Sequence, residues 1–161
     1  NVTILRHGAI TEEQLAPISA IRTVDDGTSA DSPTSPGHEK RHYSPRTPTI
    51  AVRPGVLGSM SDMIATPGVL FAGFADRRPD LPAGWSFDSL GSLGALDDVA
   101  HDLHFELRRI DALAGRAIVV ELTGKPGLGR AIDDRLTRAA GSFVVQTLDE
   151  LTATIETALT T

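Results

Sequence analysis

The stretch "RAIVVELTGKPGLGRAIDDRL", residues 116–136, decides the fold of this chain. Its segment "AIVVEL" is an almost continuous apolar run of strand length, which is typical of a parallel strand buried on both faces of a sheet. A glycine-rich turn follows, and Leu128, Ile132 and Leu136 then recur every four residues, as on the inner face of a helix. A buried strand, a tight turn and a helix in this order predict part of a βαβ unit.

The same alternation of strand and helix patterns continues on both sides of this stretch. Upstream, β-branched and apolar residues predict strands over residues 2–6, 49–54 and 68–75. From Leu96 to about Gly115, apolar residues recur at helical spacing, namely Val99, Ala100, Leu103, Leu107, Ile110 and Leu113. Because strands alternate with helices, we expect an α/β fold of three layers, doubly wound around a mostly parallel sheet of about five strands, flavodoxin-like or Rossmann-like.

Local signals mark the ends of other predicted elements. After a short predicted strand at residues 142–146, Thr147 and Glu150 form the T-x-x-E pattern of a capping box at the start of the last helix. Near the amino terminus, Thr11 is a candidate N-cap, and Pro17 interrupts the helix that follows it.

Two long segments carry few apolar residues. Residues 24–48 consist mainly of Ser, Thr, Pro, Gly, His and charged residues, so we interpret them as a long exposed loop. Residues 76–94 are interrupted by prolines and glycines and are interpreted as a second polar connection. The length of 161 residues predicts a single α/β domain over residues 1–161.

Composition excludes several classes of function. The net charge of −6 argues against a nucleic-acid-binding surface, which needs a clustered basic face. The absence of cysteine excludes disulfides and thiolate metal sites. The longest apolar run is far shorter than the ~20 residues that a membrane span needs, and no signal peptide is visible, so we expect a soluble cytoplasmic protein. Oligomeric state, and whether Asn1 is the natural start, stay open.

The turn "TGKPGLG", residues 123–129, is a candidate site for an anionic ligand. In open α/β sheets, ligands bind at the carboxyl ends of strands, where helix N-termini offer free amides. Thr123 would supply a hydroxyl and Lys125 a charge, while Gly124, Gly127 and Gly129 would let the backbone approach a phosphate. The glycine spacing fits neither common phosphate-binding motif. The alternative is a tight turn that only reverses the chain.

Residues 106–159 resemble the second half of a response-regulator receiver domain. In this resemblance, Thr123 matches the conserved Thr or Ser at the end of the fourth strand. The family's lysine falls on Gln146 and its proline on Thr147. Because the lysine that pairs with the phosphoryl group is replaced, the resemblance implies a non-catalytic, phosphorylation-independent signalling module that binds a protein partner.

The resemblance also assigns acidic residues upstream. The segment "TVDDG" places Asp25 and Asp26 at the acidic pair that binds Mg²⁺ in receivers, and "FDSLG" places Asp88 at the phosphorylated aspartate. Mg²⁺ is therefore the cofactor that a receiver-like site would take.

An alternative function starts from the first predicted strand. The segment "ILRHGAI" resembles the R-H-G motif of histidine phosphatases, with His7 as nucleophile and Arg6 as phosphate ligand. This favours a small phosphate-handling enzyme, histidine-phosphatase-like or nucleotide-binding, that acts on a small anionic ligand at the carboxyl edge of the sheet. His101 and His104 share a helix face but lack a third ligand, so no metal site is predicted.

Overall fold

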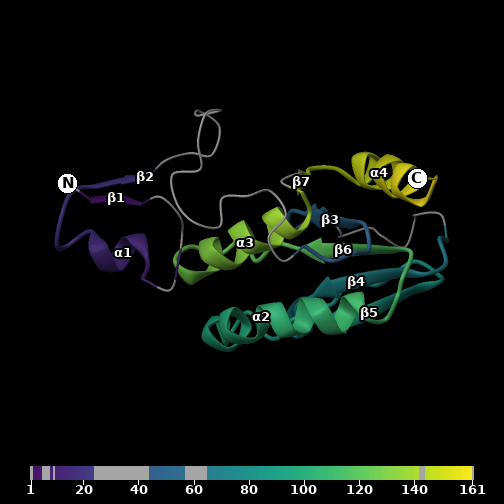
Figure 1. Ribbon diagram of the computed structural model, residues 1–161, viewed down its shortest axis with the longest axis horizontal. Coiled ribbons are helices and arrows are strands. Elements are labelled where there is room, and N and C mark those ends of the chain that lie inside the picture. Colours follow the sequence, from purple (N-terminus) through teal and green to yellow (C-terminus); the bar gives the residue numbers. More distant parts are fainter. Residues whose placement is uncertain are drawn as a thin grey trace.

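Five parallel strands form the main sheet of the computed structural model, which describes residues 2–4, 8, 10–23, 44–56, 65–141 and 144–160 (Figure 1). The strands are β3 (Thr49–Val52), β4 (Val69–Gly73), β5 (Trp85–Ser89), β6 (Ala117–Glu121) and β7 (Val144–Val145), and they lie in the order β5-β4-β6-β3-β7. The predicted α/β class with a mostly parallel sheet is confirmed.

Strand β6, the apolar run of the opening stretch, occupies the middle of this sheet. It pairs with β3 on one side, where Ile50 lies opposite Val119, and with β4 on the other, where Phe71 lies opposite Val119. All five residues of β6 are buried, as expected for a parallel strand covered on both faces. Along the chain, β3 and β4 are the first two strands of the main sheet, and the first two strands are neighbours in both the 3-2-1-4-5 and the 2-1-3-4-5 orders. In this sheet β6 lies between them.

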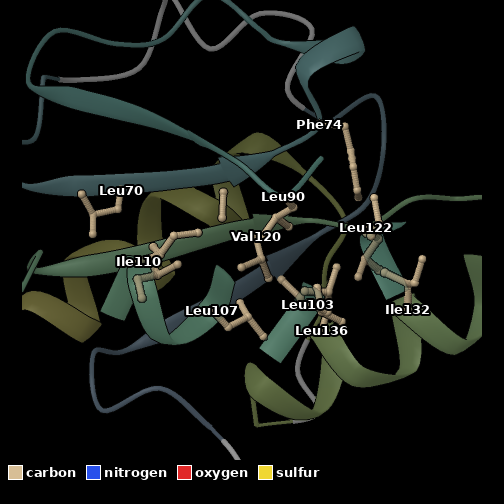
Figure 2. Packing of buried hydrophobic residues seen from close by; sticks show 14 residues of the cluster. Leu70, Phe74, Leu90, Leu103, Leu107, Ile110, Val120, Leu122, Ile132 and Leu136 are labelled. Atoms are coloured by element: carbon tan, nitrogen blue, oxygen red, sulfur yellow. The ribbon is translucent and has the colours of Figure 1, made fainter. Parts of the chain in front are cut away.

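Helices cover both faces of the sheet. Helices α2 (Leu96–Asp111) and α3 (Leu128–Ala139) pack on one face, and α4 (Leu148–Thr160) packs on the other (Figure 1). Successive residues of β6 point to opposite faces, so Ile118 and Val120 join the core under α2 and α3 while Ala117 and Val119 join the core under α4. Figure 2 shows the first core, to which α2 contributes Leu103, Leu107 and Ile110 and α3 contributes Ile132 and Leu136, on the same face of the sheet.

A smaller parallel sheet lies at the amino-terminal end, formed by β1 (Val2–Ile4) and β2 (Ile21–Thr23). The short helix α1 (Glu12–Leu15) lies between them in sequence, and Thr11 caps it as predicted, accepting a hydrogen bond from the Gln14 amide at 3.4 Å. The helix ends two residues before Pro17, also as predicted. An ion pair of 2.6 Å between Glu12 and Arg130 joins this unit to α3.

The prediction of an irregular connection at residues 76–94 is wrong. A short 3₁₀ helix, η2 (Ala75–Arg77), and strand β5 lie within or overlap this segment. Trp85 pairs with Val69 and Phe87 with Phe71 in register with β4. The prolines and Gly84 precede the strand, and Gly91 and Gly94 follow it, so none of them interrupts it. The alternation of Trp85 and Phe87 with polar residues is a period-two strand signal.

The last helix begins close to the predicted pattern. The Glu150 amide donates to Thr147 Oγ1 at 3.2 Å, which is the N-cap bond that the T-x-x-E pattern predicts. The Glu150 carboxylate accepts from the Gln146 amide at 2.8 Å, one residue before the expected donor. None of the described helices is long and apolar enough to cross a membrane.

Candidate functional site

The turn between β6 and α3 depends on two glycines with positive φ. Gly124 has φ +64°, and its added Cβ would lie 2.7 Å from Pro54 Cγ. Gly127, the residue before α3, has φ 61° and ψ −123°, a conformation in which an L side chain is strained. The turn therefore requires glycine at both positions for reasons of backbone geometry alone.

Several polar groups of this turn form hydrogen bonds within the turn itself or with the helix α3 that follows it. The carboxylate of Asp133, on α3, accepts hydrogen bonds from the amides of Thr123 at 2.6 Å and Gly124 at 3.1 Å. The hydroxyl of buried Thr123 accepts from the Lys125 amide at 3.1 Å and donates to the Gly129 carbonyl at 3.3 Å. Asp133 thus occupies amides that an external anion would need. This geometry favours the interpretation as a chain-reversing turn, and anion binding by residues 123–129 stays a prediction.

Arg77, the last residue of η2 after β4, contacts the end of the neighbouring strand β6 at the same edge of the sheet. Its Nε lies 3.0 Å from Glu121 Oε2, and its two terminal nitrogens donate to the carbonyls of Thr123 at 3.1 Å and Leu122 at 2.6 Å. The guanidinium carbon also lies 5.5 Å from the centre of the Phe74 ring. One guanidinium therefore ties η2 to the end of β6 through a fork of donors whose geometry is rigid.

The pKa values of two carboxyl groups of this network, buried Glu121 and partly buried Asp133, are shifted. Burial raises the pKa of Glu121, and the neighbouring Arg77 charge only partly offsets it. Burial also raises the pKa of Asp133, while the amides of Thr123 and Gly124 act in the opposite direction. Sequence analysis missed Arg77, Glu121 and Asp133 as members of this edge. The one available signal was Asp133, which lies on the same helix face as Gly129 and therefore near the turn.

The other predicted site residues are not assembled with this turn. Asp88 lies within β5, and its Oδ1 is 2.9 Å from Arg109 Nη1 on α2. Arg109 in turn contacts Glu106 at 2.7 Å, so Asp88 belongs to a structural ion-pair cluster. Four predicted residues, Arg6, His7, Asp25 and Asp26, lie outside the described part of the chain. Within the described ranges, no three His, Cys, Asp or Glu side chains gather as metal ligands.

Comparison with known proteins gives one consistent result. A family model described as threonylcarbamoyl-AMP synthase, C-terminal domain, matches residues 10–141. The threonylcarbamoyl-AMP synthase of Bacillus subtilis (strain 168) is 30% identical over 152 residues, covering 89% of this chain and 43% of that protein. The enzyme of the same name from Pyrococcus abyssi (strain GE5 / Orsay) is 27% identical over 157 residues, with the same coverage of each chain.

A solved structure supports the same relationship. The crystal structure of P. abyssi Sua5 complexed with L-threonine matches with a TM-score of 0.66 and 25% identity, over 90% of this chain and 44% of that chain. The chain therefore spans less than half the length of the relatives that it matches.

These findings correct the functional predictions. The resemblance to a receiver domain is wrong, because the matched family model covers residues 10–141 and describes a different protein. The strand order is also not the 2-1-3-4-5 order of receivers, and Asp88 is held by Arg109 within a strand. The predicted function that rested on this resemblance, a non-catalytic signalling module that binds a protein partner, is therefore also wrong. The alternative prediction, a histidine-phosphatase-like or nucleotide-binding phosphate-handling enzyme, is also wrong, because both relatives are threonylcarbamoyl-AMP synthases.

Proposed function

Because this chain belongs to the family of threonylcarbamoyl-AMP synthase C-terminal domains, we propose that it contributes to the synthesis of threonylcarbamoyl-AMP as one domain of such an enzyme. The match over residues 10–141 carries this proposal. It is supported by the two curated relatives, each of which aligns with 89% of this chain.

We assign the domain a supporting role within the enzyme. The relatives are more than twice as long as the part that this chain covers, which leaves most of their length for substrate binding and chemistry. Within the described residues, the polar groups at the end of β6 are largely engaged with one another through Arg77 and Asp133. L-Threonine, the ligand of the P. abyssi structure, is the substrate that we expect the complete enzyme to bind.

The chemistry of threonylcarbamoyl-AMP suggests how a second domain could support its synthesis. A carbamoyl group joined to AMP is a mixed anhydride, and water hydrolyses such a bond. An enzyme that makes it gains from a domain that limits access of water to the reacting groups. A rigid α/β body with two separate cores is suited to holding such a position.

The test measures product formation by the longer protein that we expect to contain this chain. The product joins a threonine amine, a carbonyl carbon and AMP, so the assay supplies L-threonine, bicarbonate and ATP and detects threonylcarbamoyl-AMP by mass spectrometry. We expect the longer protein to form the product and the 161-residue chain alone to form none. A truncated form of the longer protein that lacks residues 44–161, checked for folding by circular dichroism, should form threonylcarbamoyl-AMP at least about tenfold more slowly.

Each alternative outcome identifies a different error. Product formation by the 161-residue chain alone would place the chemistry in this domain. Full activity of the folded truncated version would remove the supporting role. An inactive longer protein would contradict the proposed function as a whole.

A further inference from the structure

A cleft of about 370 Å³ lies between the segment that leads into β3 and the carboxyl-terminal half of α2. Pro45 and Arg46 line one side, and His104, Leu107 and Arg108 line the other. Because these residues precede β3 and lie toward the end of α2, the cleft is at the amino edge of the sheet, opposite the turn after β6. Its volume falls within the range of ~300–1,000 Å³ that small-molecule sites occupy.

Hydrogen bonds to the rest of the fold hold the walls of this cleft in place. The carboxylate of Asp111, the last residue of α2, accepts from the amides of Arg46 at 3.1 Å and Thr47 at 2.9 Å. Burial opposes ionisation of Asp111, but these amides, the Thr47 hydroxyl and the charge of Arg46 together outweigh it and lower the pKa of the carboxyl. The Ser44 hydroxyl donates to the Arg138 carbonyl at 3.4 Å. The cleft is therefore formed before any ligand arrives, and both oxygens of its acidic residue are already engaged.

Positive charge converges on the cleft from three elements. Arg46 comes from the segment before β3 and Arg108 from α2, and no described carboxylate forms an ion pair with either guanidinium. On the α2 side of the cleft, the pKa of His104 is lowered by partial desolvation and by the charges of Arg135 on α3 and Arg108. Among the described residues that line the cleft, the guanidinium groups of Arg46 and Arg108 stand against the carboxylate of Asp111, and Arg135 adds positive charge near His104. This local excess of positive charge occurs in a chain whose net charge is −6.

We propose that this cleft binds a small phosphate-bearing ligand, with the guanidinium groups of Arg46 and Arg108 on opposite sides of the phosphate. Arginine presents a planar fork of donors that matches phosphate oxygens, which distinguishes it from a simple point charge. Pro45 and Leu107 supply an apolar wall for an uncharged part of the ligand. The site goes beyond the proposed function, because it is independent of where threonylcarbamoyl-AMP is made.

Binding would also change the acidity of His104. A phosphate between the arginines counters the charges that disfavour the imidazolium, so the pKa of His104 rises when the ligand is bound. Among the described residues, Arg108 and Arg135 are the charged groups that lower the pKa of this imidazole, and Asp111 is already engaged with backbone amides. The imidazole therefore reports occupancy of the cleft by a signal that a distant binding site would not produce.

The test measures binding of inorganic pyrophosphate and inorganic phosphate to the 161-residue chain by calorimetry at physiological ionic strength, with acetate as a comparison anion. We expect saturable binding of pyrophosphate that Arg46→Ala and Arg108→Ala each weaken by at least about tenfold. Arg53→Ala is the matched control, since it removes the same charge from an exposed position just after β3, at the opposite edge of the sheet. Its affinity should change by less than about twofold.

Imidazole NMR on the same samples should show a raised pKa of His104 when pyrophosphate is bound. Circular dichroism confirms that each variant is folded. Equal weakening by all three arginine substitutions would overturn the proposal, because it would show non-specific attraction to positive charge. Absence of saturable pyrophosphate binding would also overturn it, as would acetate binding as tightly as pyrophosphate.

Discussion

Asp133 gives the turn after β6 an internal negative partner. Its two carboxylate oxygens accept from the amides of Thr123 and Gly124, which lie just after β6 and before the first turn of α3. This one side chain therefore supplies the acceptor for two amides of the turn from within the same fold. The interaction also joins the end of a strand to the helix that follows it, which fixes how α3 leaves the sheet.

Substitution of Asp133 tests how much this partner stabilises the fold. Asp133→Ala leaves two amides without their acceptor, one of them on buried Thr123, so we expect a loss of about 1–3 kcal/mol in the free energy of unfolding. Asp134→Ala is the control on the same helix, because the described contacts of the Asp134 carboxylate are with the Arg138 side chain and not with backbone amides, so we expect a smaller loss, below about 1 kcal/mol. Urea unfolding of both variants makes the comparison. Equal losses would show that Asp133 contributes no more than a part-buried helical ion pair does.

Glu121 predicts a dependence of stability on pH. Because burial raises the pKa of Glu121 above the ordinary value of 4.5, the folded protein binds its proton more tightly than the unfolded chain does. The contribution of Glu121 is therefore most favourable below pH 4.5 and falls as the pH rises through its raised pKa in the folded state. In Glu121→Gln this loss is absent, so the variant should gain stability relative to the parent as the pH rises from 4.5 toward neutrality.

Urea midpoints of the parent and Glu121→Gln across this pH range measure the difference. The matched control is Glu156→Gln, at an exposed position of α4. A parent protein that becomes more stable than Glu121→Gln as the pH rises would show that the ion pair with Arg77 outweighs burial.

At the scale of elements, α4 depends on the cap at its first turn. It covers the core that contains Leu151 and Ile155, and the Thr147 hydroxyl accepts the Glu150 amide at its start. Thr147→Ala should cost about 1 kcal/mol and increase hydrogen exchange in α4 more than in α2. Thr152→Ala is the control, because the Thr152 hydroxyl donates to the Leu148 carbonyl inside the helix, where alanine is at least as favourable. Equal exchange in both variants would contradict a capping role for Thr147.

The sequence predicted elements well where their own pattern is strong. Strand β6 was found because its apolar run is nearly continuous over a strand length, and α2 and α3 were found because their apolar residues recur at the helical period. Strand β5 was missed because only two large apolar residues, Trp85 and Phe87, carry its period-two pattern. Pairing with β4 stabilises the strand, and a short stretch of sequence does not show which strand it pairs with.

At the scale of the whole molecule, fold class could be predicted but strand order could not. The alternation of strands and helices specifies parallel crossovers, whereas the insertion of β6 between β3 and β4 depends on contacts between residues far apart in sequence. The same limit applies to the candidate site. Residues 123–129 were identified from their own composition, but Arg77 reaches them from another strand end, and no local pattern predicts that contact.

The central place of β6 has a consequence for the chain while it is being synthesised. Strands β4 and β5 can pair as soon as both have left the ribosome, but β3 has to wait for β6, which is made much later. At roughly 5–20 residues per second, the nascent chain carries an unpaired apolar strand for several seconds. During this interval, the segment around Ile50 and Val52, which is buried in the finished sheet, lacks both of its neighbouring strands.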